Sequence, residues 1–398
     1  MLITEVETFA VRNPPPSHGG PWFLFVVLRT DNGSVGVGEA YIASVGPHAA
    51  AVVLEDVAER HLLGHDPFRI ESFVRRARSG GYSPRPDPTL MGAVSALEMA
   101  CWDIIGKEVG RPVHDLIGGR VRDSIRAYTY LYPRPGDDGD VYTDPHVAAA
   151  RAVEEVERGF TAVKLDPAGP YSAYDGRQPS LARLDLTEAM VAAVRDAVGA
   201  RADICVGTHG QFTYSGALRL ARRLESHDPL WFEEPTPPED PEQMARVAAG
   251  TSIPVATGER LCTMDDFVAV LRAGAASILQ PNLGRAGGIL EGRKIAALAE
   301  VHGAQVAPHL YCGPVVAAAN INVAAVIPNL LVLEAIGDFS GFHAELLETP
   351  IRVEDGFVIP SAEPGLGVVL DEKVARAHRY EGNDLHLAPA TEPPAWND

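Results

Sequence analysis

Polar side chains recur along the second half of the chain, each directly after a short apolar segment. From Glu233 to His309 their spacing is 23 to 27 residues. The set combines carboxylates, which bind divalent cations, with histidine and lysine, which transfer protons. Any one of them alone is more simply a helix cap or a surface charge, but their common interval favours one shared site. The residues are Lys164, Asp166, His209, Glu233, Glu234, Glu259, Asn282, His309 and Glu334.

The apolar segments that precede these residues predict eight short strands. Amphipathic helical stretches such as "LTEAMVAAVRDAVG" and "ILEGRKIAALAEVHG" lie between them. Regular alternation of this kind predicts a parallel α/β barrel, whose catalytic side chains lie at the carboxyl ends of its strands. We place this barrel at residues 121–341. The predicted strands are "IRAYTYLY", "TAVKLD", "ADICVG", "PLWFEEP", "IPVATGE", "ASILQPN", "AQVAPH" and "LLVLEA".

Strands and helices are segregated over residues 1–120, which predicts a separate α+β domain. "LITEVETFAV" and "FLFVVLRTDNGSVGVGEA" are β-rich, and apolar residues recur at helical spacing from "AAAVVLEDVAERHLL" to "GAVSALEMACWDIIGKEVG". "IGGRVRDS" marks the boundary. The segment 342–398 contains the predicted hairpin "TPIRVEDGFVIP", and we expect it to return to the first domain.

Composition limits the possible partners. The formal net charge of −19 argues against nucleic acid or an anionic membrane, although a bound cation would allow an anionic small substrate. The four cysteines are scattered and lie in or beside apolar runs, which fits a reducing cytoplasm. The start "MLITEVETFAV" lacks the basic region of a signal peptide, and no apolar run reaches membrane-spanning length. We expect a cytoplasmic homo-oligomer.

Several motifs carry a resemblance to a known family. "SALEMACWDIIGKEVGRPVHDLIGG", "WFEEP", "ATGERL", "ILQPNLGRAGGI" and "APH" resemble the mandelate racemase branch of the enolase superfamily. The resemblance covers nearly the whole chain and is closest to the galactonate-dehydratase-like acid-sugar enzymes. It implies a modified (β/α)7β barrel, capped by an α+β domain formed by the N-terminal region and the C-terminal tail. It also implies Mg²⁺, which stabilises the enediolate formed when the proton α to a carboxylate is removed.

The resemblance also implies individual roles. Glu233 and Glu259 match two metal ligands, and His309 matches a base on the seventh strand. Glu334 matches an acid that hydrogen-bonds the substrate carboxylate, and His209 matches a general acid that expels a β-hydroxyl. Lys164 lies where relatives place a base for the other face. A lysine near a divalent cation should have a lowered pKa, whereas its plainer interpretation is a salt bridge to Asp166 or a glutamate.

Two positions depart from the family pattern. Gly207 stands where the first metal carboxylate is usual, and Asn282 stands where an aspartate usually orients the histidine of the seventh strand. Asp166 is the nearest substitute ligand, because Lys164 and Asp166 share parity on one strand and both face the barrel interior. His209 or water are the other options, and Asp166 could instead only pair with Lys164. Asn282 cannot stabilise an imidazolium as a carboxylate would, which weakens His309 as a base.

Substrate contacts are harder to infer. "NPPPSHGGPW" lies where relatives have a mobile lid, so that His18 and Trp22 either touch substrate or decorate the surface. "GGYSPRPDP" is a second candidate lip with Tyr82 and Arg85, and Tyr311 is a further candidate beside His309. The long insertion "PAGPYSAYDGRQPS" contains two residues that either approach the site or make an oligomer contact, namely Tyr174 and Arg177.

Three functions are compatible with this sequence. The first is a Mg²⁺-dependent dehydratase of carbohydrate catabolism that acts on an acid sugar. The second is a cycloisomerase of an anhydro-sugar acid, or a racemase, with the same first step. The third is a catalytically inactive relative or binding protein that has lost its metal, an option that Gly207 keeps open. The identity and stereochemistry of the substrate cannot be inferred from the sequence.

Overall fold

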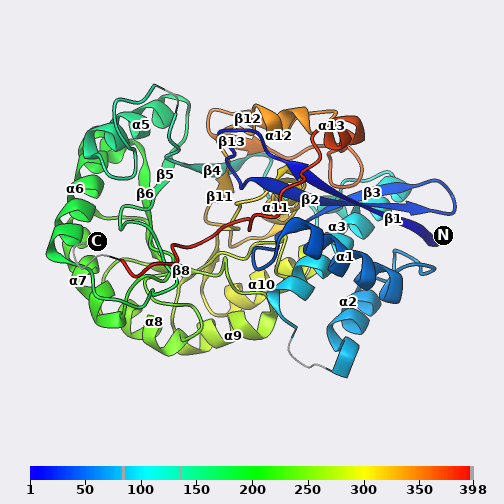
Figure 1. Ribbon diagram of the computed structural model, residues 1–398, viewed down its shortest axis with the longest axis horizontal. Helices are drawn as coiled ribbons and strands as arrows, with labels where there is room; N and C mark the ends of the chain where they lie inside the picture. The colour runs from blue at the N-terminus through cyan, green and yellow to red at the C-terminus, as the bar shows by residue number, and fades with distance from the viewer. Residues whose placement is uncertain (83–85, 135, 395–398) are drawn as a thin grey trace.

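A computed structural model of the protein describes residues 1–82, 86–134 and 136–394. Its larger part is a ring of parallel strands surrounded by helices (Figure 1). The strands pair in chain order from β4 to β10, β11 pairs with β4, and a bridge between Val306 and Leu330 closes the ring. Every segment predicted as a strand forms one. The strands are β4 (Ile125–Tyr130), β5 (Ala162–Leu165), β6 (Asp203–Gly207), β7 (Trp231–Glu233), β8 (Val255–Thr257), β9 (Ile278–Leu279), β10 (Gln305–Val306) and β11 (Leu333–Ala335).

In the part of the chain that the structure describes, seven barrel helices separate these eight strands, which confirms the (β/α)7β prediction. Helices α5 to α9 each begin after an Asp, Ser or Thr whose side chain accepts a hydrogen bond from the first turn. Such caps satisfy backbone N–H groups that have no partner within the helix. The helices are α5 (Pro145–Glu157), α6 (Leu181–Val198), α7 (Tyr214–Leu224), α8 (Pro241–Ala248), α9 (Met264–Ala273), α10 (Gly288–Val301) and α11 (Pro314–Val326).

The first domain packs an antiparallel sheet against helix α3 (Pro88–Val109). A Cβ on Gly38 would lie only 1.8 Å from the Ala96 carbonyl oxygen of α3, so glycine permits this close approach. Contrary to the sequence prediction, α3 is long and apolar enough to cross a membrane, yet 83% of its most apolar window is buried inside the protein. It is the domain's core helix. The other elements are β1 (Ile3–Arg12), β2 (Trp22–Thr30), β3 (Val35–Ala40), α1 (Pro47–His61), α2 (Ile70–Ser79), η1 (Gly80–Tyr82) and α4 (Val113–Leu116).

Two buried glutamates of the first domain connect it to the barrel. Helices α10 and α11 have no side-chain cap from their own N-cap residues, which are both glycines. Glu98 instead accepts hydrogen bonds from the first backbone N–H groups of α10, at 2.8 and 2.9 Å. Glu39 accepts three at the start of α11, at 2.5 to 3.0 Å. The domain contact therefore fixes the two helices that follow strands β9 and β10.

The C-terminal segment contacts both domains. The predicted hairpin, β12 (Arg352–Glu354) and β13 (Phe357–Ile359), pairs with β4 of the barrel sheet and not with the first domain, because β13 adds antiparallel to the start of β4. After α12 (Phe342–Glu345), this hairpin and α13 (Glu372–Ala377), the chain returns to the first domain, where Tyr380 N donates to Ala10 O at 2.8 Å. Residues 380–390, here called the crossover segment, then run across the barrel mouth (Figure 1).

Candidate active site

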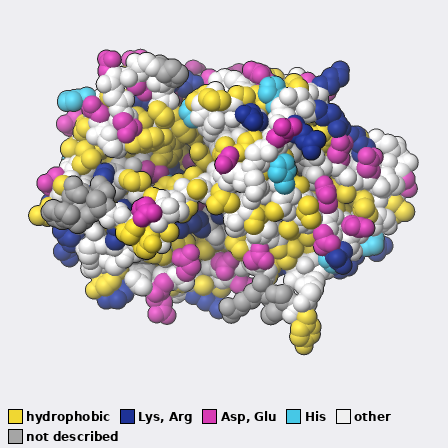
Figure 2. All heavy atoms as spheres, viewed as in Figure 1, with side chains coloured by type: hydrophobic (Ala, Val, Ile, Leu, Met, Phe, Trp, Pro, Cys, Tyr) yellow, Lys and Arg dark blue, Asp and Glu magenta, His cyan; other side chains and the backbone are white. Residues whose placement is uncertain are grey.

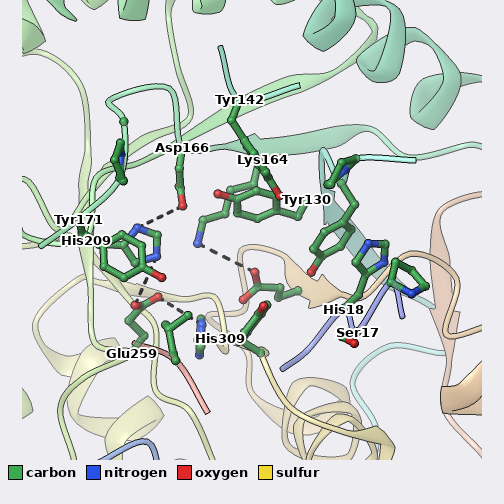
Figure 3. A pocket seen from close by; sticks show the side chains of 18 of the residues that line it. Ser17, His18, Tyr130, Tyr142, Lys164, Asp166, Tyr171, His209, Glu259 and His309 are labelled. Atoms are coloured by element: carbon green, nitrogen blue, oxygen red, sulfur yellow. Dashed lines mark ion pairs between the residues drawn. The ribbon is translucent and has the colours of Figure 1, made fainter. Parts of the chain in front are cut away.

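The carboxyl ends of the barrel strands surround a cavity of about 560 Å³. Acidic side chains are spread over the surface on this side of the molecule (Figure 2), in keeping with the negative net charge. Figure 3 shows the cavity's polar side chains pointing toward one another from successive strands. Of the polar residues predicted at the strand ends, six line the cavity: Lys164, Asp166, His209, Glu259, His309 and Glu334. Glu233, Glu234 and Asn282 are buried around these residues and do not line the cavity.

Lys164 lies at the end of β5 and is 2% exposed. Its Nζ lies 2.5 Å from Glu233 Oε1 and 4.0 Å from Glu334 Oε1. Burial acts to lower the pKa of Lys164, but the surrounding carboxylates, Glu233 first among them, raise it well above the ordinary value. The expectation of a lowered lysine pKa refers to a bound divalent cation; in the protein alone, the negative charges around the ammonium group outweigh its burial.

Glu233 holds Lys164 from a fully buried position on β7. Its second oxygen, Oε2, accepts hydrogen bonds from Trp231 Nε1 at 2.9 Å and Gln280 Nε2 at 2.7 Å. Three donors therefore fix this carboxylate, which leaves it little rotational freedom. The neighbouring Glu234 points elsewhere and pairs with Arg260 at 2.8 Å, so the two consecutive glutamates have different environments.

His209 follows β6 and lies between two carboxylates. Its Nδ1 is 3.1 Å from Asp166 Oδ2, its Nε2 is 3.8 Å from Glu259 Oε1, and the Tyr171 ring lies 4.7 Å from its own ring (Figure 3). The backbone of His209 is left-handed, with φ of 47°, a conformation that is costly for a residue with a side chain and is frequent at functional sites. Burial acts to lower the pKa of His209, but Asp166 and Glu259 raise it overall. The imidazole is thus held ready to carry a proton.

Glu259 lies between the two histidines of the site. Its Oε2 is 3.2 Å from His309 Nε2, while Oε1 faces His209. Burial acts to raise the pKa of Glu259, but His309, His209 and Lys164 lower it overall. The carboxylate is therefore ionised, and it is 8% exposed.

Asn282 determines which ring nitrogen of His309 carries the proton. The Asn282 Oδ1 atom accepts a hydrogen bond from Gly284 N at 2.8 Å, so its NH₂ group faces His309 Nδ1 at 2.9 Å. The amide donates, hence Nδ1 accepts, and the proton of the neutral ring lies on Nε2, facing Glu259. Burial lowers the pKa of His309 to about 3, which keeps the ring neutral. An aspartate at position 282 would favour the opposite tautomer.

Glu334 completes the polar floor from β11. Its Oε2 accepts a hydrogen bond from Leu310 N at 2.7 Å. Burial raises the pKa of Glu334 to about 7, so that this carboxyl can carry a proton near neutral pH. A protonated carboxyl can donate a hydrogen bond to a bound carboxylate.

The upper wall of the cavity is aromatic, which the sequence analysis largely missed. His18 and Tyr311 do line it, and the His18 ring stacks on Tyr132 with 4.0 Å between ring centroids. The signal for the others was the alternation "YTYLY" at the end of β4, which places Tyr130 and Tyr132 on one side. The other tyrosines of this wall come from distant loops. The wall tyrosines that the sequence analysis missed are Tyr41, Tyr130, Tyr132, Tyr142 and Tyr171, and it also missed Leu387, which lines the same cavity.

Other predicted substrate contacts do not reach the cavity. Trp22 is fully buried in the core of the first domain, where its Nε1 donates to Asp384 O at 3.0 Å. The Tyr82 side chain is fully exposed on the surface beyond α2. Tyr174 and Arg177 also do not line the cavity, and Arg177 pairs with Asp175. Arg85 lies outside the described residues.

Carboxylates with the right chemistry for a divalent cation lie around His209. Within the described ranges, no three His, Cys, Asp or Glu side chains converge as a ready-made metal centre. The carboxylates nevertheless offer oxygen ligands to a hard cation, because Asp166 Oδ1 is a buried oxygen without a hydrogen-bond partner in the described part of the protein. Buried polar atoms of this kind require an explanation, and a bound ion is one.

Comparisons with known proteins agree with this architecture. Residues 17–118 match the mandelate racemase/muconate lactonizing enzyme N-terminal domain, and residues 147–374 match the enolase C-terminal domain-like family. A D-galactonate dehydratase of Ralstonia pickettii is 35% identical over 96% of both chains, and one of Variovorax paradoxus is 36% identical over 94% of this chain and 93% of the relative. A solved mandelate racemase/muconate lactonizing enzyme from a Sulfitobacter species is 52% identical over 100% of both chains, with a TM-score of 0.97. The chain belongs to the mandelate racemase branch of the enolase superfamily.

Proposed function

We propose that this protein is a Mg²⁺-dependent dehydratase of an acid sugar. It would remove the proton α to the substrate carboxylate and expel a hydroxyl group from the β-carbon. The observation that carries the proposal is His209, because it faces the cavity with its own carboxylate partner and is separate from the lysine at the end of β5. A dehydratase needs a base and a distinct acid for the leaving hydroxyl. The D-galactonate dehydratases among the relatives support the same reaction class.

Lys164 is the best candidate for the base. Its Nζ reaches the cavity from β5. In the protein alone Glu233, at 2.5 Å, holds the ammonium form, so Lys164 would act as a base once a bound cation had taken over that carboxylate. His309 is less suited to this role, because Asn282 directs the lone pair of the neutral ring away from Glu259 and toward the amide. We assign to His309 the task of donating a hydrogen bond from Nε2.

The remaining polar residues would bind the substrate and return the proton. Glu334, whose pKa is raised to about 7 by burial, can donate a hydrogen bond to the substrate carboxylate when protonated. His209 would deliver a proton to the leaving β-hydroxyl, and Asp166 would hold the resulting tautomer through Nδ1. The tyrosine wall would exclude bulk water, which strengthens these electrostatic interactions.

Mg²⁺ fits the carboxylates at the strand ends. Glu233 and Glu259 supply hard oxygen ligands of the kind that this ion binds. When bound, the ion would hold the substrate carboxylate and stabilise the negative charge that develops on it during proton removal. Lys164 would then have to release Glu233, since both compete for the same carboxylate oxygen.

A screen of acid sugars and anhydro-sugar acids tests this proposal. The purified protein is incubated with Mg²⁺ and each compound in deuterated buffer, and products are analysed by mass spectrometry and NMR. Loss of one water molecule with formation of a 2-keto acid is the expected result. A product that keeps all the oxygen atoms of the substrate and gains at most one solvent deuterium would identify a cycloisomerase or racemase instead, which the same base could serve. Neither product formation nor α-proton exchange with any compound would contradict the proposal.

The same proposal extends to partners and compartment. The partner is a small carboxylate, with no nucleic acid or membrane involved, and the enzyme acts in the cytoplasm as a homo-oligomer. The negative net charge supports the exclusion of nucleic acid and anionic membranes, and the scattered free cysteines support the compartment.

A further inference from the structure

Gly207 occupies a position where any side chain would collide with Asp166. A Cβ built on Gly207 would lie 1.9 Å from Asp166 Oδ1. The φ angle of Gly207 is not positive, so ordinary strand backbone at the end of β6 does not itself require glycine. Glycine fits here because no space is left for a side chain at position 207. The Asp166 carboxylate, from the neighbouring strand β5, occupies the volume that a side chain on β6 would fill.

Asp166 points from this volume toward the centre of the site. Its Oδ2 faces His209 Nδ1 at 3.1 Å, and its Oδ1 is buried with no hydrogen-bond partner among the described residues. On the other side of the same imidazole, the Glu259 side chain is 8% exposed, and its Oε2 faces His309 Nε2 at 3.2 Å. Two carboxylates from different strands thus flank the His209 ring, and one Asp166 oxygen there has no hydrogen-bond partner among the described residues.

The charge balance of the region leaves room for a third carboxylate. The Lys164 ammonium group already neutralises the single charge of Glu233 at 2.5 Å. Glu233 and Glu259 alone would therefore bind a divalent cation weakly. Divalent hard cations prefer several anionic oxygen ligands. Asp166 supplies one more negative charge from within the barrel mouth.

We propose that Asp166 is the third carboxylate ligand of the divalent cation and replaces the side chain that Gly207 lacks. The ligand has moved from one strand to its neighbour while remaining in the same volume. This inference rests on the proposed function only in requiring that the site binds Mg²⁺. The competing interpretation is that Asp166 does no more than orient His209, in which case its removal would leave cation affinity unchanged.

Four proteins test the inference by cation affinity alone: wild type, Asp166→Ala, Gly207→Asp, and the double variant. Affinity for Mg²⁺ is measured by calorimetry, and affinity for Mn²⁺ by electron paramagnetic resonance of the free ion. We expect Asp166→Ala to weaken binding by about tenfold or more. The double variant should recover most of this loss, because its carboxylate on β6 enters the vacated volume. Gly207→Asp alone should lower the melting temperature, since two side chains then compete for one space.

Asp140→Asn is the matched control, because Asp140 also lines the cavity and the change removes the same charge. Its cation affinity should stay within about twofold of wild type if the loss in Asp166→Ala reflects direct ligation, since a distant exposed charge is screened. Equal affinity in Asp166→Ala and wild type would overturn the inference, as would a wild type that binds neither ion. A failed substrate screen with intact cation binding would count against the proposed function alone.

Discussion

Buried carboxylates occur in two regions of this protein, and they are satisfied to different degrees. At the domain contact, Glu39 and Glu98 receive backbone N–H groups at the starts of α11 and α10. At the barrel mouth, Asp166 keeps one buried oxygen without a hydrogen-bond partner in the described structure, and Glu259 faces the rings of His209 and His309. The first pair has backbone donors for its oxygens, whereas the second leaves one oxygen of Asp166 open to a ligand.

The two regions are also physically linked. The helices capped by Glu98 and Glu39 follow the strand ends that carry Asn282 and His309. Glu39 and Glu98, whose oxygens accept backbone hydrogen bonds, thus hold the helices that support the site. Asp166, which has an oxygen without a hydrogen-bond partner among the described residues, lies within the site. If this distinction is right, substitutions in the two regions should affect different measurements, catalysis in one case and stability in the other.

The largest expected effect is on catalysis, from Lys164→Ala. Loss of a general base lowers turnover by about 10²- to 10⁴-fold. His309→Ala should cause a smaller decrease, because Asn282 holds His309 as a hydrogen-bond donor. Steady-state kinetics on the substrate found by the screen measures both variants, with circular dichroism as a check of folding. Turnover of Lys164→Ala near that of wild type would exclude lysine from the mechanism.

His209→Asn should separate two steps of the reaction. The variant is expected to exchange the α-proton with solvent deuterium while its rate of product formation falls by about 10²-fold, since only the acid for the leaving hydroxyl is missing. NMR in deuterated water follows exchange, and mass spectrometry follows product. If exchange and product formation disappear together, His209 is a base or a ligand and not the acid.

Glu39→Ala should affect stability and not chemistry. Three N–H groups at the start of α11 would lose their acceptor, which costs about 2 kcal/mol of unfolding free energy. Urea denaturation measures the change, and Glu39→Gln is the matched control because its amide oxygen can still accept a hydrogen bond. A free energy of unfolding for Glu39→Ala equal to that of wild type would show that water replaces the carboxylate without cost.

The smallest expected effect is the pH dependence of stability that Glu98 contributes. Burial raises its pKa from the ordinary 4.5 to about 8, so between these values the folded state binds more protons than the unfolded state. The free energy of unfolding should therefore decrease as pH rises from about 5 to 8, by up to about 1.4 kcal/mol per pH unit from this group. Glu98→Gln should flatten that decrease in urea denaturation. The same slope in variant and wild type would contradict the shift.

The framework of the site could be predicted from the sequence, because strand ends follow from local patterns. The apolar segments before Glu233, Glu259 and His309 each formed a strand of the barrel. Strand parity likewise placed Lys164 and Asp166 on one side, as the structure shows. Such periodicities depend on neighbouring residues alone.

What could not be predicted depends on long-range packing. Tyr41 and Leu387 reach the cavity from segments far apart in the chain, and no local pattern marks them. Trp22 ends a sequence segment that resembled a lid, but it begins strand β2 and its indole packs into the first domain's core. The pairing of Gly207 with Asp166 became interpretable only when the distance between them was known, because the glycine alone resembles a lost ligand.

The crossover segment has a consequence for synthesis of the protein. Ala390 forms backbone hydrogen bonds with Tyr171 and Ala173, and Tyr171 lies against the His209 ring. Position 390 follows the end of the last barrel strand, Ala335, by 55 residues, which a ribosome adds in roughly 3 to 11 s at ordinary elongation rates. For that interval the nascent barrel has an uncovered mouth, and its acidic strand ends face the surrounding solution and the ions in it. The pocket reaches its final shape only after the capping domain, made first, has been joined by a segment made much later.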